Sequence, residues 1–349
     1  SVSLRILGIL LMLFSTAMLA PLIMALLADD HTSTGFFSAL GITFLSGLLL
    51  WLPVRNAQHD LRIRDGFLIT SLFWTVLGVF GALPFYLNDF LNLTLTEAIF
   101  ESISGLTTTG ATVIVGLDDL PQSILIYRQL LQWLGGIGII VVAVAVLPML
   151  GIGGMQLYKA ETPGPSKDSK LTPRITQTAK ALASVYVALT LACAAAYYVA
   201  GMTGFDAIAH AFSTVAIGGF STHDASMGYF ENDNILLVCS IFMCFSAINF
   251  GLHFLAWRQR SASVYSKDSE TRFFLSVLLV CIGITCAYLM LTETLGTRES
   301  ITHGVFQAIS ITTTTGFATQ NFALWPSFLP VMMPVSYTHL RAHETTRHI

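Results

Sequence analysis

The sequence predicts an all-α protein that crosses a membrane several times. Hydrophobic residues make up 54% of the 349 residues and charged residues only 11%, whereas soluble domains carry roughly a quarter charged residues. Several apolar runs also exceed the ~20 residues that a helix needs to span a bilayer. A third observation is an amphipathic segment that occurs three times. Together they exclude a soluble globular domain, and the lack of a basic tract argues against nucleic acid as a partner.

The repeated segment has the same pattern in all three copies. The copies are EAIFESISGLTTTGATV at residues 97–113, DAIAHAFSTVAIGGFST at 206–222 and HGVFQAISITTTTGFAT at 303–319. They align on Gly110, Gly219 and Gly316. In each copy apolar residues recur at helical spacing until small residues, hydroxyl groups and a glycine break the pattern. Each copy therefore predicts a short pore helix that runs into an extended filter.

The filter interpretation follows from what a cation needs inside a bilayer. Backbone carbonyls and threonine hydroxyls can replace the oxygens of its hydration shell. Glycine can adopt the positive φ values that turn successive carbonyls toward one axis, and a helix that ends before the filter directs its partial negative charge at the ion. An ordinary polar turn between two membrane helices explains one copy equally well. Three copies in register favour the filter.

The other elements are placed around these loops in chain order. Two spans, at residues 4–27 and 35–54, form a hairpin without a pore loop, and the first is expected to be a retained spanning helix, not a cleaved signal peptide. Each later unit has a span, a pore helix, a filter and a returning span. The expected spans of these units are 66–87 and 124–150, then 175–200 and 235–257, and finally 273–295 with a returning helix that starts near Leu324.

The charged residues predict an orientation. The links at residues 55–64, 159–180 and 258–272 hold nearly all basic residues, and acidic residues collect in the alternate loops. Because lysine and arginine accumulate in cytoplasmic loops, the amino terminus is expected to be cytoplasmic and the filters to open outward. Arg128 and Arg298 fall on the outer side and have no explanation in this scheme.

Other polar residues on the pore helices are further candidate sites. His210 and His303 occupy different positions in the repeat and lack metal-ligand spacing, so structural polar packing is expected. Glu97 and Asp206 are expected to cap their helices, whereas Glu101 could be either a cap or a carboxylate near the ion path. No catalytic constellation is present, so the protein is not expected to be an enzyme or to need a cofactor. Gly135, in the LGGIG stretch, is expected to let another backbone pack closely.

At this point the chain resembles the Trk/Ktr/HKT superfamily of potassium transporters, and within it the bacterial Trk-type potassium uptake membrane subunits. The resemblance covers residues 1 to about 335, and its most specific stretches are residues 132–180 and the three filters. It implies potassium uptake across the bacterial inner membrane by a multi-pass symporter or channel of a Trk system. It also implies a homodimer and a cytosolic nucleotide-binding ring that gates the pore.

The resemblance also places the selectivity filter. K⁺ is the transported ion, and the backbone carbonyls that coordinate it would belong to Thr108, Thr109, Gly110, Ile217, Gly218, Gly219, Thr314, Thr315 and Gly316. The basic links at 159–180 and 258–272 are the expected contacts of the gating ring. Two alternatives stay open: a sodium or mixed sodium/potassium transporter, and a non-conducting fragment or scaffold.

The expected domain organisation has five parts. They are an N-terminal hairpin (1–64), a first pore unit (65–158), a cytoplasmic link with the second pore unit (159–258), an incomplete third pore unit (259–335) and a tail (336–349). The family pattern has a fourth pore unit that does not follow here. The tail, SYTHLRAHETTRHI, is polar where an apolar helix should continue, so we expect it to be a foreign sequence on a truncated gene.

Overall fold

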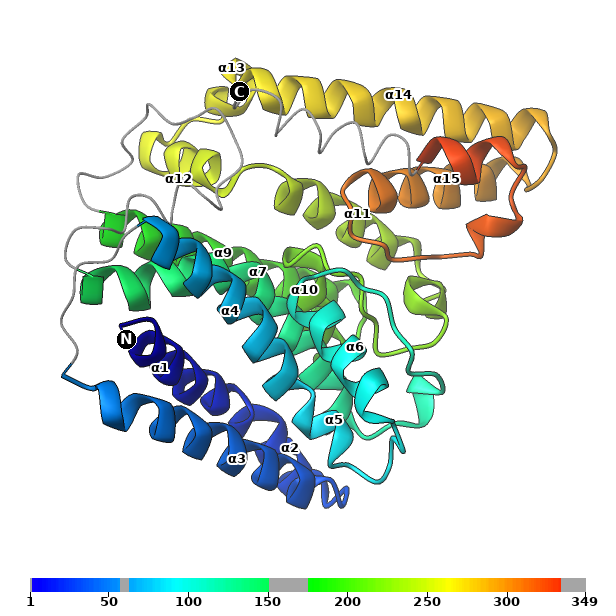
Figure 1. Ribbon diagram of the computed structural model, residues 1–349. Coiled ribbons are helices and arrows are strands. Elements are labelled where there is room, and N and C mark those ends of the chain that lie inside the picture. Colours follow the sequence, from blue (N-terminus) through cyan, green and yellow to red (C-terminus); the bar gives the residue numbers. More distant parts are fainter. Residues whose placement is uncertain (1, 57–62, 151–174, 334–349) are drawn as a thin grey trace. The chain divides into compact units, whose positions relative to one another are not determined.

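The computed structural model describes residues 2–56, 63–150 and 175–333, and all regular structure in these ranges is helical (Figure 1). The described residues form two compact units, the first made of α1 to α7 and the second of nearly all of α9 and the elements after it. The predicted link at 159–174 and the predicted tail at 336–349 lie outside the described residues. The expected all-α architecture is confirmed.

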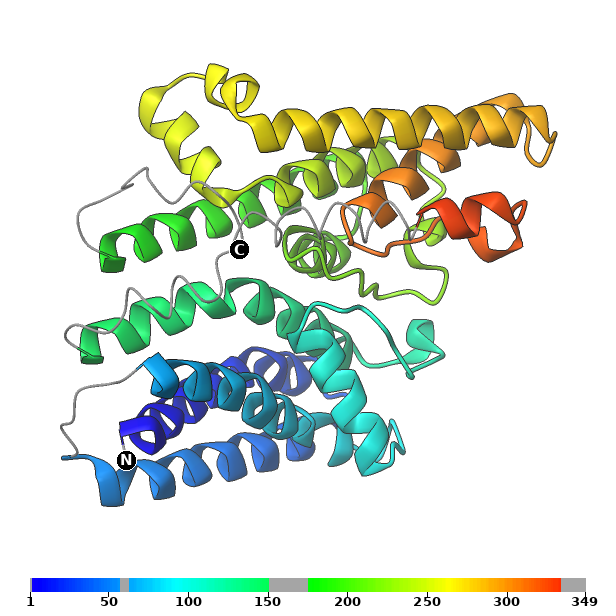
Figure 2. The same cartoon turned by 45° about the horizontal axis from the view of Figure 1, so that its top comes forward.

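The N-terminal hairpin is present as predicted. Its elements are α1 (Val2–Ala17), α2 (Leu19–Ala28), α3 (Ser33–Trp51) and the short η1 (Leu52–Val54). Helices α1 and α3 lie side by side (Figure 2). Glycines allow this close packing, because a Cβ atom on Gly8 would lie 2.6 Å from the carbonyl oxygen of Gly47. The hairpin therefore owes its close approach to residues without side chains.

The first pore unit follows the hairpin. It contains α4 (Ile63–Gly81), α5 (Leu83–Tyr86), the pore helix α6 (Leu95–Leu106), η2 (Leu117–Asp119) and the returning helix α7 (Gln122–Leu150). Helix α6 packs against both α4 and α7. The hydroxyl of Tyr127 on α7 donates to the carbonyl oxygen of Gly81 at 2.9 Å, which joins the two spans on either side of the pore loop.

The second pore unit repeats this order with one difference. It contains α9 (Ile175–Ala200), the pore helix α10 (Gly204–Val215), η3 (Ser226–Tyr229), α11 (Asp233–Ala247) and α12 (Phe250–Gln259). The sequence predicts one returning span at 235–257, but α11 and α12 are bent by 94° at a short break. The segment is therefore two helices and not one continuous helix.

The break has a local cause. Asn249 adopts a non-helical conformation, and its side chain accepts a hydrogen bond from Gly251 N at 2.8 Å, which begins α12. The carbonyl oxygen of Phe245, near the end of α11, lies 2.8 Å from Nε2 of His253. An asparagine cap and a side-chain partner for a freed carbonyl group satisfy the backbone at the break. Apolar composition alone does not reveal this.

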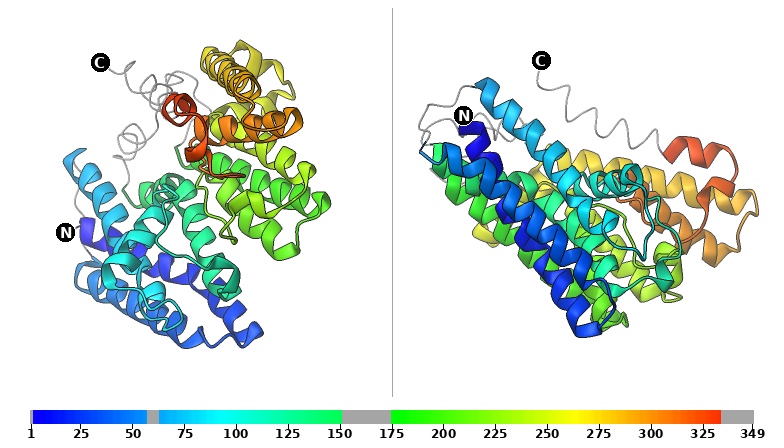
Figure 3. Two further views of the ribbon diagram at one scale, coloured as in Figure 1. Left: turned by 90° about the vertical axis from the view of Figure 1, so that its right-hand side faces the viewer. Right: turned by 60° about the horizontal axis from the view of Figure 1, so that its bottom comes forward.

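The third unit contains α13 (Ser263–Lys267), α14 (Ser269–Leu291), the pore helix α15 (Thr297–Thr312) and η4 (Phe322–Leu324). Helices α14 and α15 pack along each other (Figure 3). Residues 328–333 are again helical, in agreement with the predicted start of a returning span. Their apolar side chains join a buried cluster of Leu289, Trp325, Leu329 and Met333.

Four helical stretches among the described residues are long and apolar enough to cross a membrane, and the bent pair α11 and α12 would make a fifth. The four are residues 2–28, 33–54, 180–200 and 269–291. They agree with the predicted spans at these places, although α14 begins and ends four residues before the predicted boundaries.

Candidate functional site

The pore helices of the first two units begin with the same cap. Thr94 Oγ1 accepts a hydrogen bond from Glu97 N at 3.3 Å, and the Glu97 carboxylate accepts one from Thr94 N at 2.8 Å. Thr203 Oγ1 likewise accepts from Asp206 N at 3.1 Å. The predicted capping is confirmed for Glu97, whereas the cap of the second pore helix is Thr203 and the Asp206 carboxylate accepts from the hydroxyl groups of Thr203 and Thr222. Hydrogen bonds from the Thr94 side chain and backbone also lower the pKa of Glu97.

All three pore helices end in the same way. In the first, Thr109 N donates to Ser104 O at 2.9 Å, and Thr108 N to Gly105 O at 3.0 Å. The same two bonds recur at the aligned positions, from Gly218 and Ile217 in the second unit and from Thr315 and Thr314 in the third. This is the Schellman arrangement, in which the residue after the C-cap is left-handed. Each predicted filter therefore starts directly at a helix C-terminus.

The left-handed residue is β-branched in every copy. It is Thr108 (φ 55°), Ile217 (φ 54°) and Thr314 (φ 68°). Glycine usually fills this position, because a left-handed conformation is unfavourable for a residue with a branched side chain. Strain of this kind is maintained only when the surrounding structure enforces it, and it concentrates at functional sites. Its recurrence three times marks these residues as the candidate site.

The sign of φ then alternates through each filter. The glycines two residues later, Gly110, Gly219 and Gly316, have φ values of 78°, 79° and 85°. The residue between the two left-handed positions is not among the described residues with positive φ. An alternation of left- and right-handed residues turns successive peptide groups so that their carbonyl oxygens face one side. The structure therefore gives each filter a backbone suited to a row of carbonyl ligands.

The second and third filters are neighbours, and both belong to the second of the two compact units. A Cβ atom on Gly219 would lie 2.1 Å from the carbonyl oxygen of Thr315. Beyond the filters, Gly228 N donates to Ala318 O at 3.1 Å, and Ala318 N donates to Ser226 Oγ at 3.2 Å. Six of the nine predicted filter residues are thus brought together here. The other three, Thr108 to Gly110, belong to the first compact unit.

A glycine on the returning helix supports the first filter. A Cβ atom on Gly135 of α7 would lie 1.9 Å from the carbonyl oxygen of Leu106, the last residue of the pore helix. The prediction that this glycine permits close packing is confirmed. The position of the filter therefore depends on direct backbone contact between α7 and the end of α6.

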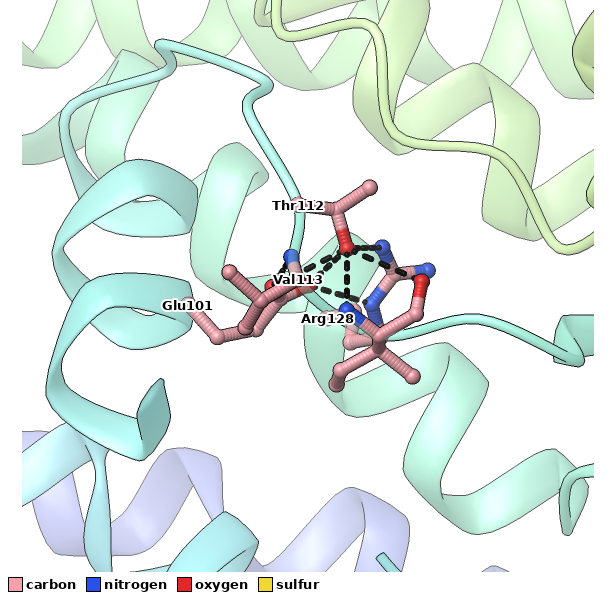
Figure 4. Close-up of polar contacts among 5 residues, drawn as sticks. Glu101, Thr112, Val113 and Arg128 are labelled. Atoms are coloured by element: carbon pink, nitrogen blue, oxygen red, sulfur yellow. Dashed lines mark hydrogen bonds and ion pairs between the residues drawn. The ribbon is translucent and has the colours of Figure 1, made fainter. Parts of the chain in front are cut away.

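Glu101 and Arg128 form a buried ion pair that the sequence analysis missed. Arg128 Nε lies 2.8 Å from Glu101 Oε1, and the two side chains are 1% and 0% exposed. Thr112 Oγ1 donates to the same carboxylate at 2.9 Å, Val113 N donates to it at 3.0 Å, and Arg128 Nη2 donates to Thr112 at 3.1 Å (Figure 4). Arg128 is therefore not a residue of the outer loops. The available signal was Glu101, a charged residue within an apolar stretch of the pore helix.

Arg298, the other arginine without an explanation, forms an exposed ion pair. Its Nη2 donates to Asp233 Oδ2 at 2.6 Å, and the two side chains are 86% and 58% exposed. Exposed pairs of this kind contribute little stability. Arg128 and Arg298 look alike in the sequence, but only Arg128 is connected to a pore loop in this way.

The two histidines form polar contacts, as predicted. His210 Nδ1 lies 2.9 Å from Asp206 O, and its Nε2 lies 2.9 Å from Ser221 Oγ. His303 Nδ1 lies 3.0 Å from Thr319 Oγ1. Within the part of the chain that the structure describes, no group of three His, Cys, Asp or Glu side chains could hold a metal ion.

The repeated pore helices and strained filters define a membrane protein of the pore-loop class. A family model described as "Cation transport protein", TrkH, matches residues 32–338. The chain therefore belongs to the TrkH family of cation transport proteins, which is a family of transporters and not of enzymes.

Individual relatives support this assignment. The Trk system potassium uptake protein TrkH of Halomonas elongata is 56% identical over 95% of this chain and 69% of its own length. The protein of the same name from Escherichia coli K12 is 51% identical over 94% of this chain and 68% of its own length. The crystal structure of the potassium transporter TrkH from Vibrio parahaemolyticus has a TM-score of 0.84 and 50% identity, and the match covers 95% of this chain and 68% of that chain.

Proposed function

We propose that this protein takes up potassium ions across a membrane through a filter lined by backbone carbonyls. The observation that carries the proposal is the threefold repetition of one strained backbone at Thr108, Ile217 and Thr314, each followed two residues later by a left-handed glycine. Strain that recurs at equivalent positions is accounted for by a shared function. Carbonyl oxygens arranged in this way replace the hydration shell of a cation.

The pore helices contribute to the electrostatics of this site. Each helix ends two residues before its filter begins, so the partial negative charge of its C-terminus is directed at the filter entrance. The three helices are 12 to 16 residues long. A cation at a filter would be stabilised without any charged ligand, which leaves it free to move on.

The identity of the ion rests on the relatives. Several of them, at 51–56% identity, carry the name potassium uptake protein, and we propose K⁺ as the substrate of this chain as well. None of these names supports the sodium or mixed-ion alternative. The nine filter residues named from the sequence remain our proposed ligands.

We also propose that the chain works with a cytosolic nucleotide-binding ring. The transporter itself would be a homodimer in the bacterial inner membrane, with the amino terminus of each chain in the cytoplasm. The relatives' names place them in a Trk system, which supports a multicomponent transporter. The basic side chains of the predicted link at residues 258–272 are exposed, and we propose that they contact such a ring. They are Arg258, Arg260, Lys267 and Arg272.

Rubidium influx tests the transport proposal. A bacterial host without its own potassium uptake would express the protein, and influx of Rb⁺ would be measured with and without excess Na⁺. We expect Rb⁺ influx that K⁺ suppresses at much lower concentrations than Na⁺ does, and we expect Gly110→Asp to abolish it because a carboxylate would enter the filter. Influx that is unaffected by Gly110→Asp would contradict the proposal.

A further inference from the structure

Each pore helix carries a buried polar residue nine positions before the filter glycine. The residues are Glu101, His210 and Gln307, which are at most 1% exposed. A polar side chain buried at this depth needs a partner. In every unit at least one partner belongs to the segment that follows the filter glycine, which we call the post-filter segment (residues 111–114, 220–223 and 317–320).

The second and third units use uncharged contacts from this position. His210 Nε2 lies 2.9 Å from Ser221 Oγ, and Gln307 Nε2 donates to Phe317 O at 3.4 Å. A second contact comes from one turn earlier on the same helix. Asp206 accepts from Thr222 Oγ1 at 2.8 Å, whereas His303 lies 3.0 Å from Thr319 Oγ1.

The first unit lacks this second contact, because Val113 stands where the other units have a threonine. Glu97, at the position of Asp206 and His303, bonds to its own cap residue Thr94. Glu101 takes over both contacts: its carboxylate accepts from the side chain of Thr112 and from the backbone of Val113. One residue therefore holds a post-filter segment that two residues hold elsewhere.

A carboxylate can do this only if its charge is compensated. Burying an isolated carboxylate is strongly unfavourable, and Arg128 supplies the opposite charge at 2.8 Å. Hydrogen bonds to an ionised acceptor are shorter and stronger than those between neutral groups. Because Arg128 also donates to Thr112, the post-filter segment is attached to α6 and to α7 at once.

We propose that Glu101 and Arg128 are positioning residues that set the ion selectivity of the first filter. By fixing Thr112 and Val113, they hold Gly110 in place from its C-terminal side, while the Schellman bonds hold it from the N-terminal side. A filter held at both ends cannot contract around a smaller ion, so Na⁺ is excluded. This inference rests on the proposed transport of K⁺.

Thr112 provides the cleanest test, because it is an exposed residue and its replacement leaves Glu101 and Arg128 intact. Thr112→Val has nearly the same shape but no hydroxyl group, and Thr112→Ser keeps the hydroxyl. Glu101→Gln keeps the size of the carboxylate and removes its charge. Arg298→Gln is the matched control, since it disrupts an arginine–carboxylate pair that is exposed.

The readout is the Na⁺ concentration that halves Rb⁺ influx, normalised to the amount of protein in the membrane. We expect this concentration to fall about tenfold in Thr112→Val and Glu101→Gln. The free energy of a hydrogen bond to a charged group corresponds to a change of about tenfold or more in an equilibrium constant. Thr112→Ser and Arg298→Gln should keep the parental value. A loss of membrane-inserted protein alone would lower influx without moving this concentration.

The outcomes separate the two proposals. Parental Na⁺ sensitivity in Thr112→Val, with normal Rb⁺ influx, overturns the positioning role and leaves the transport function intact. If Glu101→Gln does not reach the membrane, Thr112→Val decides alone. An absence of Rb⁺ influx in the parent protein refutes the transport function and this inference with it.

Discussion

The first and second pore units share a filter but differ in what supports it. In both, the pore helix has a threonine cap, a Schellman end, a β-branched left-handed residue and a left-handed glycine. The first unit fixes its post-filter segment with the buried pair Glu101 and Arg128, and its returning helix α7 is continuous. The second uses His210 and Asp206, and its returning span is bent by 94°. The backbone of the filter is repeated, whereas its supports are not.

The largest effect is expected where the shared backbone is changed. Gly219→Ala would place a methyl group 2.1 Å from Thr315 O and force alanine to a φ of 79°. We expect complete loss of Rb⁺ influx with protein still present in the membrane. Gly204→Ala is the matched control, because a Cβ atom there meets nothing within 4 Å. Retained influx in Gly219→Ala would show that this backbone does not line the path.

The next effect separates the two kinds of support. Arg128→Met leaves Glu101 buried without its counter-charge, so we expect a loss of about 3–5 kcal/mol in the free energy of unfolding. Arg298→Met removes one partner of an exposed pair, and we expect a change of at most about 1 kcal/mol. Unfolding of the purified protein in detergent measures both. Equal losses in the two variants would count against the special role of the buried pair.

A smaller effect is expected from the contact between α7 and the pore helix. Gly135→Ala would bring a methyl group within 1.9 Å of Leu106 O, and overpacking of this kind costs about 1–3 kcal/mol. Because the strained contact is at the end of the pore helix, we also expect reduced Rb⁺ influx. In Gly138→Ala the new Cβ atom would lie at an ordinary 3.4 Å from Phe73 and Trp74, so influx should stay near the parental level. A parental influx in both variants would show that the filter does not depend on the close contact between Gly135 and Leu106.

The smallest effect concerns the break in the second unit. Asn249→Ala removes the side chain that accepts from Gly251 N, and the loss of an N-cap costs about 1 kcal/mol. Asn249→Asp keeps a capping oxygen and should stay close to the parental stability. The midpoint of thermal unfolding distinguishes the variants. An unchanged midpoint in Asn249→Ala would mean that the bend is held by other contacts.

The features that repeat in the sequence were predictable, and those that occur once were not. The glycines, the hydroxyl residues and the 3.6-residue periodicity identified the three pore loops, because each copy supported the others. Arg128 had no explanation because its charge was interpreted only by a rule for loops, although its partner is Glu101, 27 residues away on the pore helix. The bend at Asn249 was missed because hydrophobicity does not report which carbonyl groups have partners.

The central claim is that carbonyl oxygens of the three filters bind the transported ion. The most direct measurement is anomalous scattering from crystals of the purified protein grown in rubidium in place of potassium. We predict a rubidium peak beside the carbonyl groups of residues 108–110, 217–219 and 314–316. A protein that carries Rb⁺ into cells but binds it elsewhere, with no peak at these carbonyl groups, would contradict the account.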